Sequence, residues 1–167
     1  MRIILFRHGE RKNDNLTLTG KHNVKKMASQ LKEYNITRVF CSPTMRCKQT
    51  EKIIRKTLKT PPAEIREELN ERWQLNHKPV TKEEIDWWNN YMNLDFNSYV
   101  GETCKDFVSR NNIVFNEIKN RFNKDDDILI IAHTATAYAL LAYITNKQSG
   151  NIDWVKLGNA NYLAFEI

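Results

Sequence analysis

Residues 128–133 read Ile-Leu-Ile-Ile-Ala-His, a run of five apolar residues followed by a histidine. An uninterrupted run of this length is typical of a strand that is buried on both faces, as in a parallel sheet. Residues 3–8 repeat the pattern as Ile-Ile-Leu-Phe-Arg-His, and residues 37–41 form a further short strand that ends before Ser42-Pro43. The sequence therefore predicts several buried strands, each followed at once by polar residues.

Helical patterns alternate with these strands. Four helices are expected, at residues 17–34, from Pro43 to Pro61, at residues 102–122, and from His133 to about Thr145. Residues 161–167 alternate between apolar and polar side chains, which indicates a half-buried terminal strand. Strands that alternate with helices favour an α/β fold, here a three-layer α/β/α sandwich with a mostly parallel central sheet.

The chain has 167 residues, the length of one domain, and no repeat or flexible linker divides it. We expect a single domain over residues 1–167. Residues 73–100 fit the alternation least well and are rich in Trp and Tyr. We expect them to form a lid-like, partly helical insertion over one end of the sheet.

Charge indicates the kind of partner, and cysteine content indicates the compartment. The chain carries 26 Lys and Arg against 20 Asp and Glu, and residues 21–60 alone carry 11 against 2. Such a basic segment favours anionic partners. Three cysteines cannot form a disulfide framework, and neither a signal peptide nor a transmembrane segment is recognisable. A cytoplasmic protein with no membrane partner is therefore expected.

Basic side chains follow three of the predicted strands. Arg7 and His8 follow the first strand, Arg46 lies just beyond the second, and His133 follows the central one. Because the carboxyl ends of parallel strands meet at one edge of a sheet, these four side chains should converge. Two guanidinium groups and two imidazoles in one pocket suit a tetrahedral dianion such as phosphate.

These residues also carry a resemblance to a known family. Arg7-His8-Gly9-Glu10 resembles the RHG signature of the histidine phosphatase superfamily, which is also called the phosphoglycerate mutase-like family. Further segments are similar to this family in the same order, namely Leu16-Thr17-x-x-Gly20, Ser42-x-x-x-Arg46-x-x-Gln49-Thr50, Leu69-x-Glu71, Gly101-Glu102-Thr103 and Ile130-Ile131-Ala132-His133. The resemblance implies the phosphoglycerate mutase-like fold.

The resemblance also implies a covalent mechanism. His8 would attack phosphorus and form a phosphohistidine, while Arg7, Arg46, His133 and Gly9 would bind the phosphate. Glu71 would act as general acid and then as general base, so the implied catalytic residues are His8, Glu71 and His133. Glu10 is the second candidate for the proton-transfer role.

The sequence departs from the family pattern at two positions. Asp14 stands where many relatives carry a substrate-contacting Asn, and a carboxylate there would repel a phosphate. Thr134 replaces the Gly that usually follows the second histidine, and its hydroxyl could reach a phosphate oxygen. Asp14, Thr134 and Trp88 are the candidates for further substrate contact, since Trp88 could stack on an organic leaving group.

The most direct interpretation is a metal-independent phosphatase that hydrolyses phosphate monoesters and needs no cofactor. One alternative is a phosphoglycerate mutase-type phosphotransferase, which uses the same chemistry but excludes water. Another is a non-catalytic phosphate- or nucleic-acid-binding module that uses the basic segment, although no nucleic-acid motif is present. We expect a small phosphorylated substrate rather than nucleic acid, and the sequence identifies neither that substrate nor the oligomeric state.

Overall fold

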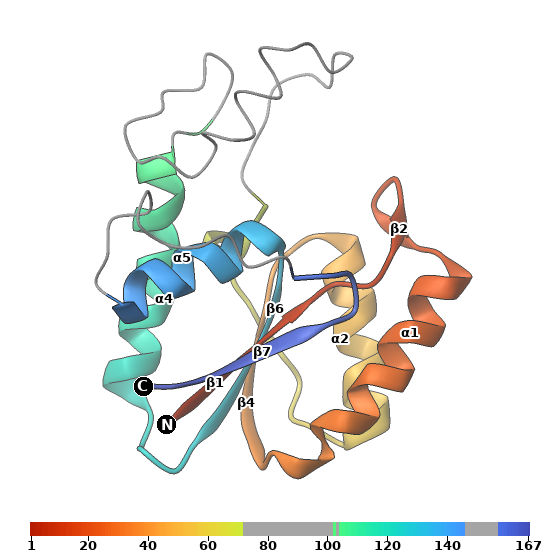
Figure 1. Cartoon of the computed structure of the whole chain (residues 1–167), viewed down its shortest axis with the longest axis horizontal. Helices are drawn as coiled ribbons and strands as arrows, with labels where there is room; N and C mark the ends of the chain where they lie inside the picture. Colours follow the sequence, from red (N-terminus) through yellow and green to blue (C-terminus); the bar gives the residue numbers. More distant parts are fainter. Residues whose placement is uncertain (72–101, 103, 146–156) are drawn as a thin grey trace.

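The computed structural model describes residues 1–71, 102, 104–145 and 157–167. Its centre is a five-stranded sheet in the order β5-β4-β6-β1-β7 (Figure 1). The strands are β1 (Arg2–Arg7), β4 (Ile36–Cys41), β5 (Glu64–Ile65), β6 (Asp127–Ala132) and β7 (Tyr162–Glu166). Every pair in this sheet is parallel except β1 with β7. The mostly parallel sheet expected from the sequence is confirmed.

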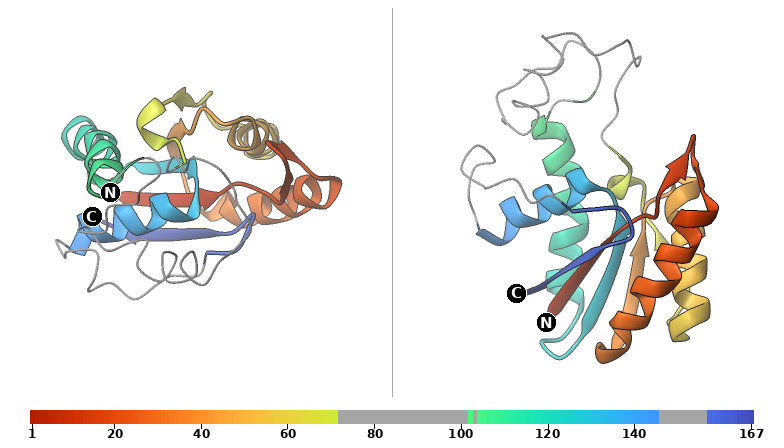
Figure 2. Two further views of the ribbon diagram at one scale, coloured as in Figure 1. Left: turned by 90° about the horizontal axis from the view of Figure 1, so that it is seen from above. Right: turned by 45° about the vertical axis from the view of Figure 1, so that its right-hand side comes forward.

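Helices cover both faces of the sheet (Figure 2), with α1 and α2 on one face and α4 and α5 on the other. Their bounds are α1 (Leu18–Ala28), α2 (Met45–Leu58), α4 (Cys104–Arg121) and α5 (Thr134–Thr145). Two 3-10 turns, η1 (Ser29–Glu33) and η2 (Glu67–Leu69), and a small hairpin of β2 (Arg11–Lys12) and β3 (Asn15–Leu16) complete the described elements. The three-layer architecture is confirmed.

The alternation of side chains along β1 shows why both faces need a cover. Ile3 and Leu5 pack into the core under α4 and α5, while Ile4 and Phe6 pack into the core under α1 and α2. All four are fully buried, and residues 128–131 of β6 divide between the two cores in the same way. Successive side chains of a strand point to opposite faces, so an unbroken apolar run requires two helical layers.

Three strands end at the same edge of the sheet. Arg7 of β1 pairs with Ala132 of β6, and Cys41 of β4 pairs with Ile131 of β6. Backbone hydrogen bonds continue just past the strands, because the His8 N–H donates to the Ala132 carbonyl. The residues that follow β1, β4 and β6 therefore lie side by side.

The ends of the described chain also meet, since the Ile167 N–H donates to the Met1 carbonyl. Within the described ranges, no helix has the length and apolar character needed to cross a lipid bilayer. The expected insertion at residues 73–100, with Trp88, lies outside the described residues, and the single-domain organisation stays a prediction.

Candidate active site

His8 follows β1 and is 4% exposed. Its Nδ1 lies 2.8 Å from the Gly9 carbonyl oxygen, which can only accept, so Nδ1 carries the ring proton and Nε2 keeps its lone pair. Burial, together with the nearby His133 and Arg46, outweighs the Gly9 hydrogen bond and lowers the pKa of His8 to about 3. His8 is therefore a neutral imidazole at neutral pH.

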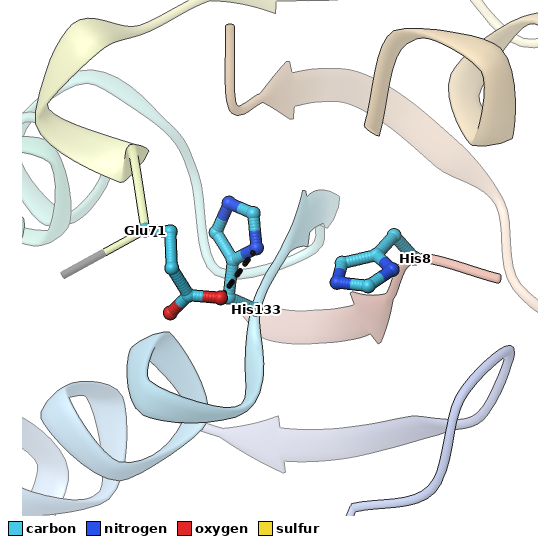
Figure 3. Close-up of side chains that lie close together, drawn as sticks. All are labelled: His8, Glu71 and His133. Carbon is cyan, nitrogen blue, oxygen red and sulfur yellow. Dashed lines mark ion pairs between the residues drawn. The ribbon is translucent and has the colours of Figure 1, made fainter. Parts of the chain in front are cut away.

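His133 follows β6 and is fully buried, with its Nδ1 3.1 Å from Glu71 Oε2 (Figure 3). Its Nε2 lies 2.9 Å from Ser42 Oγ and 3.8 Å from Cys47 Sγ. Burial lowers the pKa of His133, but the Cys47 sulfur and the Glu71 carboxylate outweigh it and raise this pKa to about 9. His133 is thus a cation at neutral pH, and its ring centroid is 5.3 Å from that of the neutral His8.

Arg46 lies in the first turn of α2, is 8% exposed, and connects the two histidines. Its Nε is 3.2 Å from His8 Nε2, and its Nη2 is 3.3 Å from His133 Nδ1 and 3.7 Å from Glu71 Oε2. Nε and Nη2 form one edge of the guanidinium, so both N–H groups of that edge point between the histidines. Such an edge binds two oxygens of a phosphate in parallel.

Asp14 holds the other end of the same guanidinium. Arg46 Nη1 donates to Asp14 Oδ1, and the Met45 N–H donates to Asp14 Oδ2 at 2.9 Å. Although burial raises the pKa of Asp14, these hydrogen bonds hold it below its usual range. The Asp14 carboxylate therefore occupies a backbone donor at the start of α2.

Glu71 follows η2, and its carboxylate points at His133 (Figure 3). Its side chain is 39% exposed. Burial acts to raise the pKa of Glu71, but His133 and Arg46 lower it to about 2. Glu71 is therefore ionised in this structure. Glu10, the second candidate, is exposed and accepts from Thr17 Oγ1 at 2.8 Å.

Two donors near this cluster have no protein partner among the described residues. Arg7 donates from Nη1 to the Leu157 carbonyl at 2.5 Å, but its Nε is shielded from solvent and unbonded. Burial lowers the pKa of Arg7, and the group interacts electrostatically with Glu71 and Arg46. The Thr134 hydroxyl, in the first turn of α5, is also shielded and unbonded within the described ranges.

Gly9 is explained by packing. A Cβ there would lie 2.7 Å from Val24 Cγ2 and 2.9 Å from the Gly20 carbonyl, so α1 approaches closer than any side chain permits. The Gly9 N–H donates to Thr50 Oγ1 at 3.2 Å. In this structure Gly9 therefore fits the close packing of α1 against the loop that carries His8, and its contact with phosphate stays a prediction.

Ser42, Cys47 and Thr50 also contribute to the site, although sequence reasoning did not place them among the candidates. Ser42 and Cys47 contact His133, and Thr50 supports the backbone beside His8. Ser42 directly follows β4, so the strand-end argument used for the histidines could have found it. Thr50 lies one helical turn after Arg46 and donates to its carbonyl.

The cluster suits an anion better than a metal ion. His8, Glu71 and His133 offer ligand atoms that all lie within 4.8 Å of one another. However, Arg46 N–H groups lie within 3.3 Å of one nitrogen of each histidine, and a guanidinium repels a cation at this distance. A tetrahedral oxyanion would instead accept from Arg46 and lie beside both imidazoles.

Comparison with solved structures shows which proteins share this fold. The structure is similar to the mycobacterial glucosyl-3-phosphoglycerate phosphatase, with a TM-score of 0.79, 17% identity, and coverage of 98% of this chain and 88% of that chain. The same enzyme in complex with inorganic phosphate gives a TM-score of 0.74, with 18% identity and the same coverage. The alpha-ribazole phosphatase from Shigella flexneri gives a TM-score of 0.79, with 19% identity and coverage of 98% and 89%.

No curated protein sequence matches the chain. The profile of the histidine phosphatase superfamily (branch 1), in contrast, matches residues 3–167, which include every element described above except the first residue of β1. This chain therefore belongs to the histidine phosphatase superfamily.

Proposed function

We propose that this protein is a metal-independent phosphatase that hydrolyses monoesters of small phosphorylated molecules through a phosphohistidine on His8. The observation that carries the proposal is the Arg46 edge, which faces His8 Nε2 at 3.2 Å and His133 Nδ1 at 3.3 Å. A neutral imidazole beside a cationic imidazole and a guanidinium edge combines a nucleophile with a phosphate cradle. Family membership and phosphatase neighbours support the same chemistry.

In the first step, phosphoryl oxygens accept from Arg46 Nε and Nη2. This releases the His8 Nε2 lone pair from the Arg46 N–H group that contacts it in this structure. Nε2 then attacks phosphorus, a P–N bond forms, and the bond from phosphorus to the ester oxygen breaks. His133 and Arg7 bind the negative charge on the other phosphoryl oxygens. The Arg7 Nε is available for this, because it has no partner among the described residues.

Glu71 supplies the proton that the leaving oxygen needs. It is ionised beside His133 in this structure. A bound phosphate dianion interacts with the positive charges of His133 and Arg46, which weakens their interaction with the Glu71 carboxylate. The dianion also adds negative charge beside Glu71. Both effects favour the protonated form of Glu71. In the second step the Glu71 carboxylate accepts a proton from water, which attacks phosphorus and releases His8 and inorganic phosphate.

The first test measures inorganic phosphate released from an aryl phosphate in the presence of EDTA. Wild type should release phosphate, and His8→Ala should lose this activity by at least about 10⁴-fold, because a covalent route has no substitute nucleophile. His22→Ala is the matched control, since His22 is an exposed histidine on α1. Activity that survives His8→Ala would contradict the covalent mechanism, and phosphate binding without turnover would favour the binding-module alternative.

A further inference from the structure

Arg110 lies on α4, and its guanidinium holds the backbone that carries Glu71. Nη1 donates to the carbonyl oxygens of Glu68 at 2.5 Å and Asn70 at 2.8 Å, and Nη2 donates to that of Glu71 at 3.2 Å. These three carbonyls belong to one residue of η2 and to the two residues that follow it. Arg110 makes no direct contact with the Glu71 carboxylate among the described interactions, so any influence on that group passes through the main chain.

Arg110 is itself fixed in place. Its Nε donates to Glu102 Oε1 at 2.5 Å, and its Nη2 donates to Glu102 Oε2 at 2.7 Å. The guanidinium also lies 4.6 Å from the centre of the Phe107 ring, which is fully buried. All five N–H donors of the guanidinium are therefore used, two toward Glu102 and three toward the carbonyls. A lysine, with three donors on one nitrogen, could not reproduce this set.

The opposite side of the same segment is held at the candidate active site. The Glu71 carboxylate lies 3.1 Å from His133 Nδ1, and the Glu71 N–H donates to Asn70 Oδ1 at 2.9 Å. The side chain of Glu71 is 39% exposed, so packing alone does not fix it. Its position depends on where the backbone of residues 68–71 is anchored, and Arg110 provides three hydrogen bonds for that anchor.

We propose that Arg110, oriented by Glu102, is a positioning residue that places the Glu71 carboxyl for proton transfer to the leaving oxygen. This inference rests on the proposed function, in which Glu71 is the general acid. A misplacement of about 1 Å in a catalytic group can cost about 10²-fold in rate. Weakening the Arg110 anchor should therefore slow the transfer to His8 only for esters whose leaving oxygen needs the proton from Glu71.

The leaving group separates this role from a purely structural one. A nitrophenolate leaves without protonation, whereas an alkoxide requires a proton in the transition state. The ratio kcat/KM reports the transfer to His8 and not the later hydrolysis of phosphohistidine, in which Glu71 serves every substrate. Arg110→Lys should lower kcat/KM for an alkyl phosphate by about tenfold, and Arg110→Ala by about 10²-fold, while kcat/KM for p-nitrophenyl phosphate falls less than about threefold. Glu71→Gln should show the same bias, and adding Arg110→Lys to it should change the ratio no further.

Arg66→Ala is the matched control. Arg66 is a well-packed arginine near the same turn, but its partners are the side-chain carboxylates of Glu64, Glu68 and Glu117. Its loss should lower stability and leave the ratio of alkyl to aryl kcat/KM unchanged. Glu102→Gln provides a milder second perturbation of Arg110, in case Arg110→Ala fails to fold.

A second readout does not require activity. An NMR titration of the His133 imidazole reports whether Glu71 still lies beside it, because the Glu71 carboxylate raises the pKa of His133. Arg110→Lys should lower this pKa by about half a unit or more, in the same direction as Glu71→Gln. Arg66→Ala should leave it unchanged.

The outcomes distinguish the inference from the proposed function. If Glu71→Gln shows no leaving-group bias, the role of Glu71 is wrong and the inference fails with it. If Glu71→Gln shows the bias while the Arg110 variants do not, only the inference is overturned. If wild type is inactive, the proposed function fails, and an unchanged His133 titration in Arg110→Lys would then overturn the placement of Glu71 by Arg110 as well.

Discussion

Replacing Glu71 by Gln should change how the stability of this protein depends on pH. The pKa of His133 is raised from 6.5 to about 9 in the folded protein, partly by the Glu71 carboxylate at 3.1 Å. Below pH 6.5 both folded and unfolded chains hold this proton, so the stabilisation is fully present. Between pH 6.5 and 9 only the folded chain holds it, so the free energy of unfolding falls as the pH rises.

The size of the effect follows from the same shift. A difference of 2.5 pKa units between folded and unfolded His133 corresponds to about 3.4 kcal/mol at about 1.36 kcal/mol per unit. Cys47 remains in the variant, and the 39% exposed Glu71 side chain is screened by solvent, so we assign about half to Glu71. Wild type should therefore lose about 1.5–2 kcal/mol more than Glu71→Gln between pH 6.5 and 9.

Urea unfolding followed by circular dichroism at the two pH values measures this difference. Other groups that titrate in the interval cancel between wild type and variant. Glu64→Gln is the matched control, because this exposed glutamate pairs with Arg66 and Arg121. Equal loss of stability in wild type and Glu71→Gln would refute the argument that the carboxylate holds a charged His133.

Three further predictions concern His8, Gly20 and Asp14. The pKa of His8 is lowered to about 3 in the folded protein, so wild type should lose about 2 kcal/mol more stability than His8→Gln on going from pH 8 to pH 5. Urea unfolding at both pH values measures this difference. Equal losses would contradict the lowered pKa. Gly20→Ala should destabilise the fold by about 2–3 kcal/mol in the same assay, because its Cβ would lie 2.2 Å from the Glu10 carbonyl oxygen. Gly158→Ala, with open space around it, should cost less than about 0.5 kcal/mol. Similar costs for both variants would be inconsistent with the close contact at Gly20. Asp14→Asn keeps an acceptor for Arg46 but removes a negative charge, so competitive inhibition by inorganic phosphate should strengthen about threefold, and unchanged or weaker inhibition would argue against charge repulsion by Asp14.

The fold could be predicted because its signals are local. The apolar runs at residues 3–6 and 128–132 fix two central strands, and the helical spacing between them supplies the outer layers. Because the carboxyl ends of parallel strands meet at one edge of the sheet, His8 is expected near His133. The pairing of Arg7 with Ala132 in the structure agrees with this expectation. These steps need only the period of each element and the direction of its strands.

The environment of Arg46 could not be predicted in the same way. Asp14 reaches Arg46 and the start of α2 from a tight turn in which Asn13 adopts a positive φ of 55°, and this turn has no periodic signal. From the sequence, only repulsion between Asp14 and phosphate was expected, and not the use of a helix donor by this carboxylate.

Glu71 is the site residue that amino-acid type alone identifies least well. It stands in an acidic run with Glu64, Glu67 and Glu68, and residue type alone cannot separate these four. The structure pairs Glu64 and Glu68 with Arg66 and places only Glu71 beside His133 in the described part of the chain. The resemblance to a family singled out Glu71, whereas the turn of η2 and the Arg110 contacts supply the physical reason.

Trapping the covalent intermediate tests the central proposal most directly. Wild type is mixed with a radiolabelled phosphate ester, denatured within milliseconds, and digested for mass spectrometry under conditions that preserve phosphohistidine. We predict acid-labile phosphate on His8 in wild type and in His22→Gln, and none in His8→Gln. Rapid phosphate release without label on His8, or label on another residue, would contradict a mechanism in which His8 Nε2 attacks phosphorus.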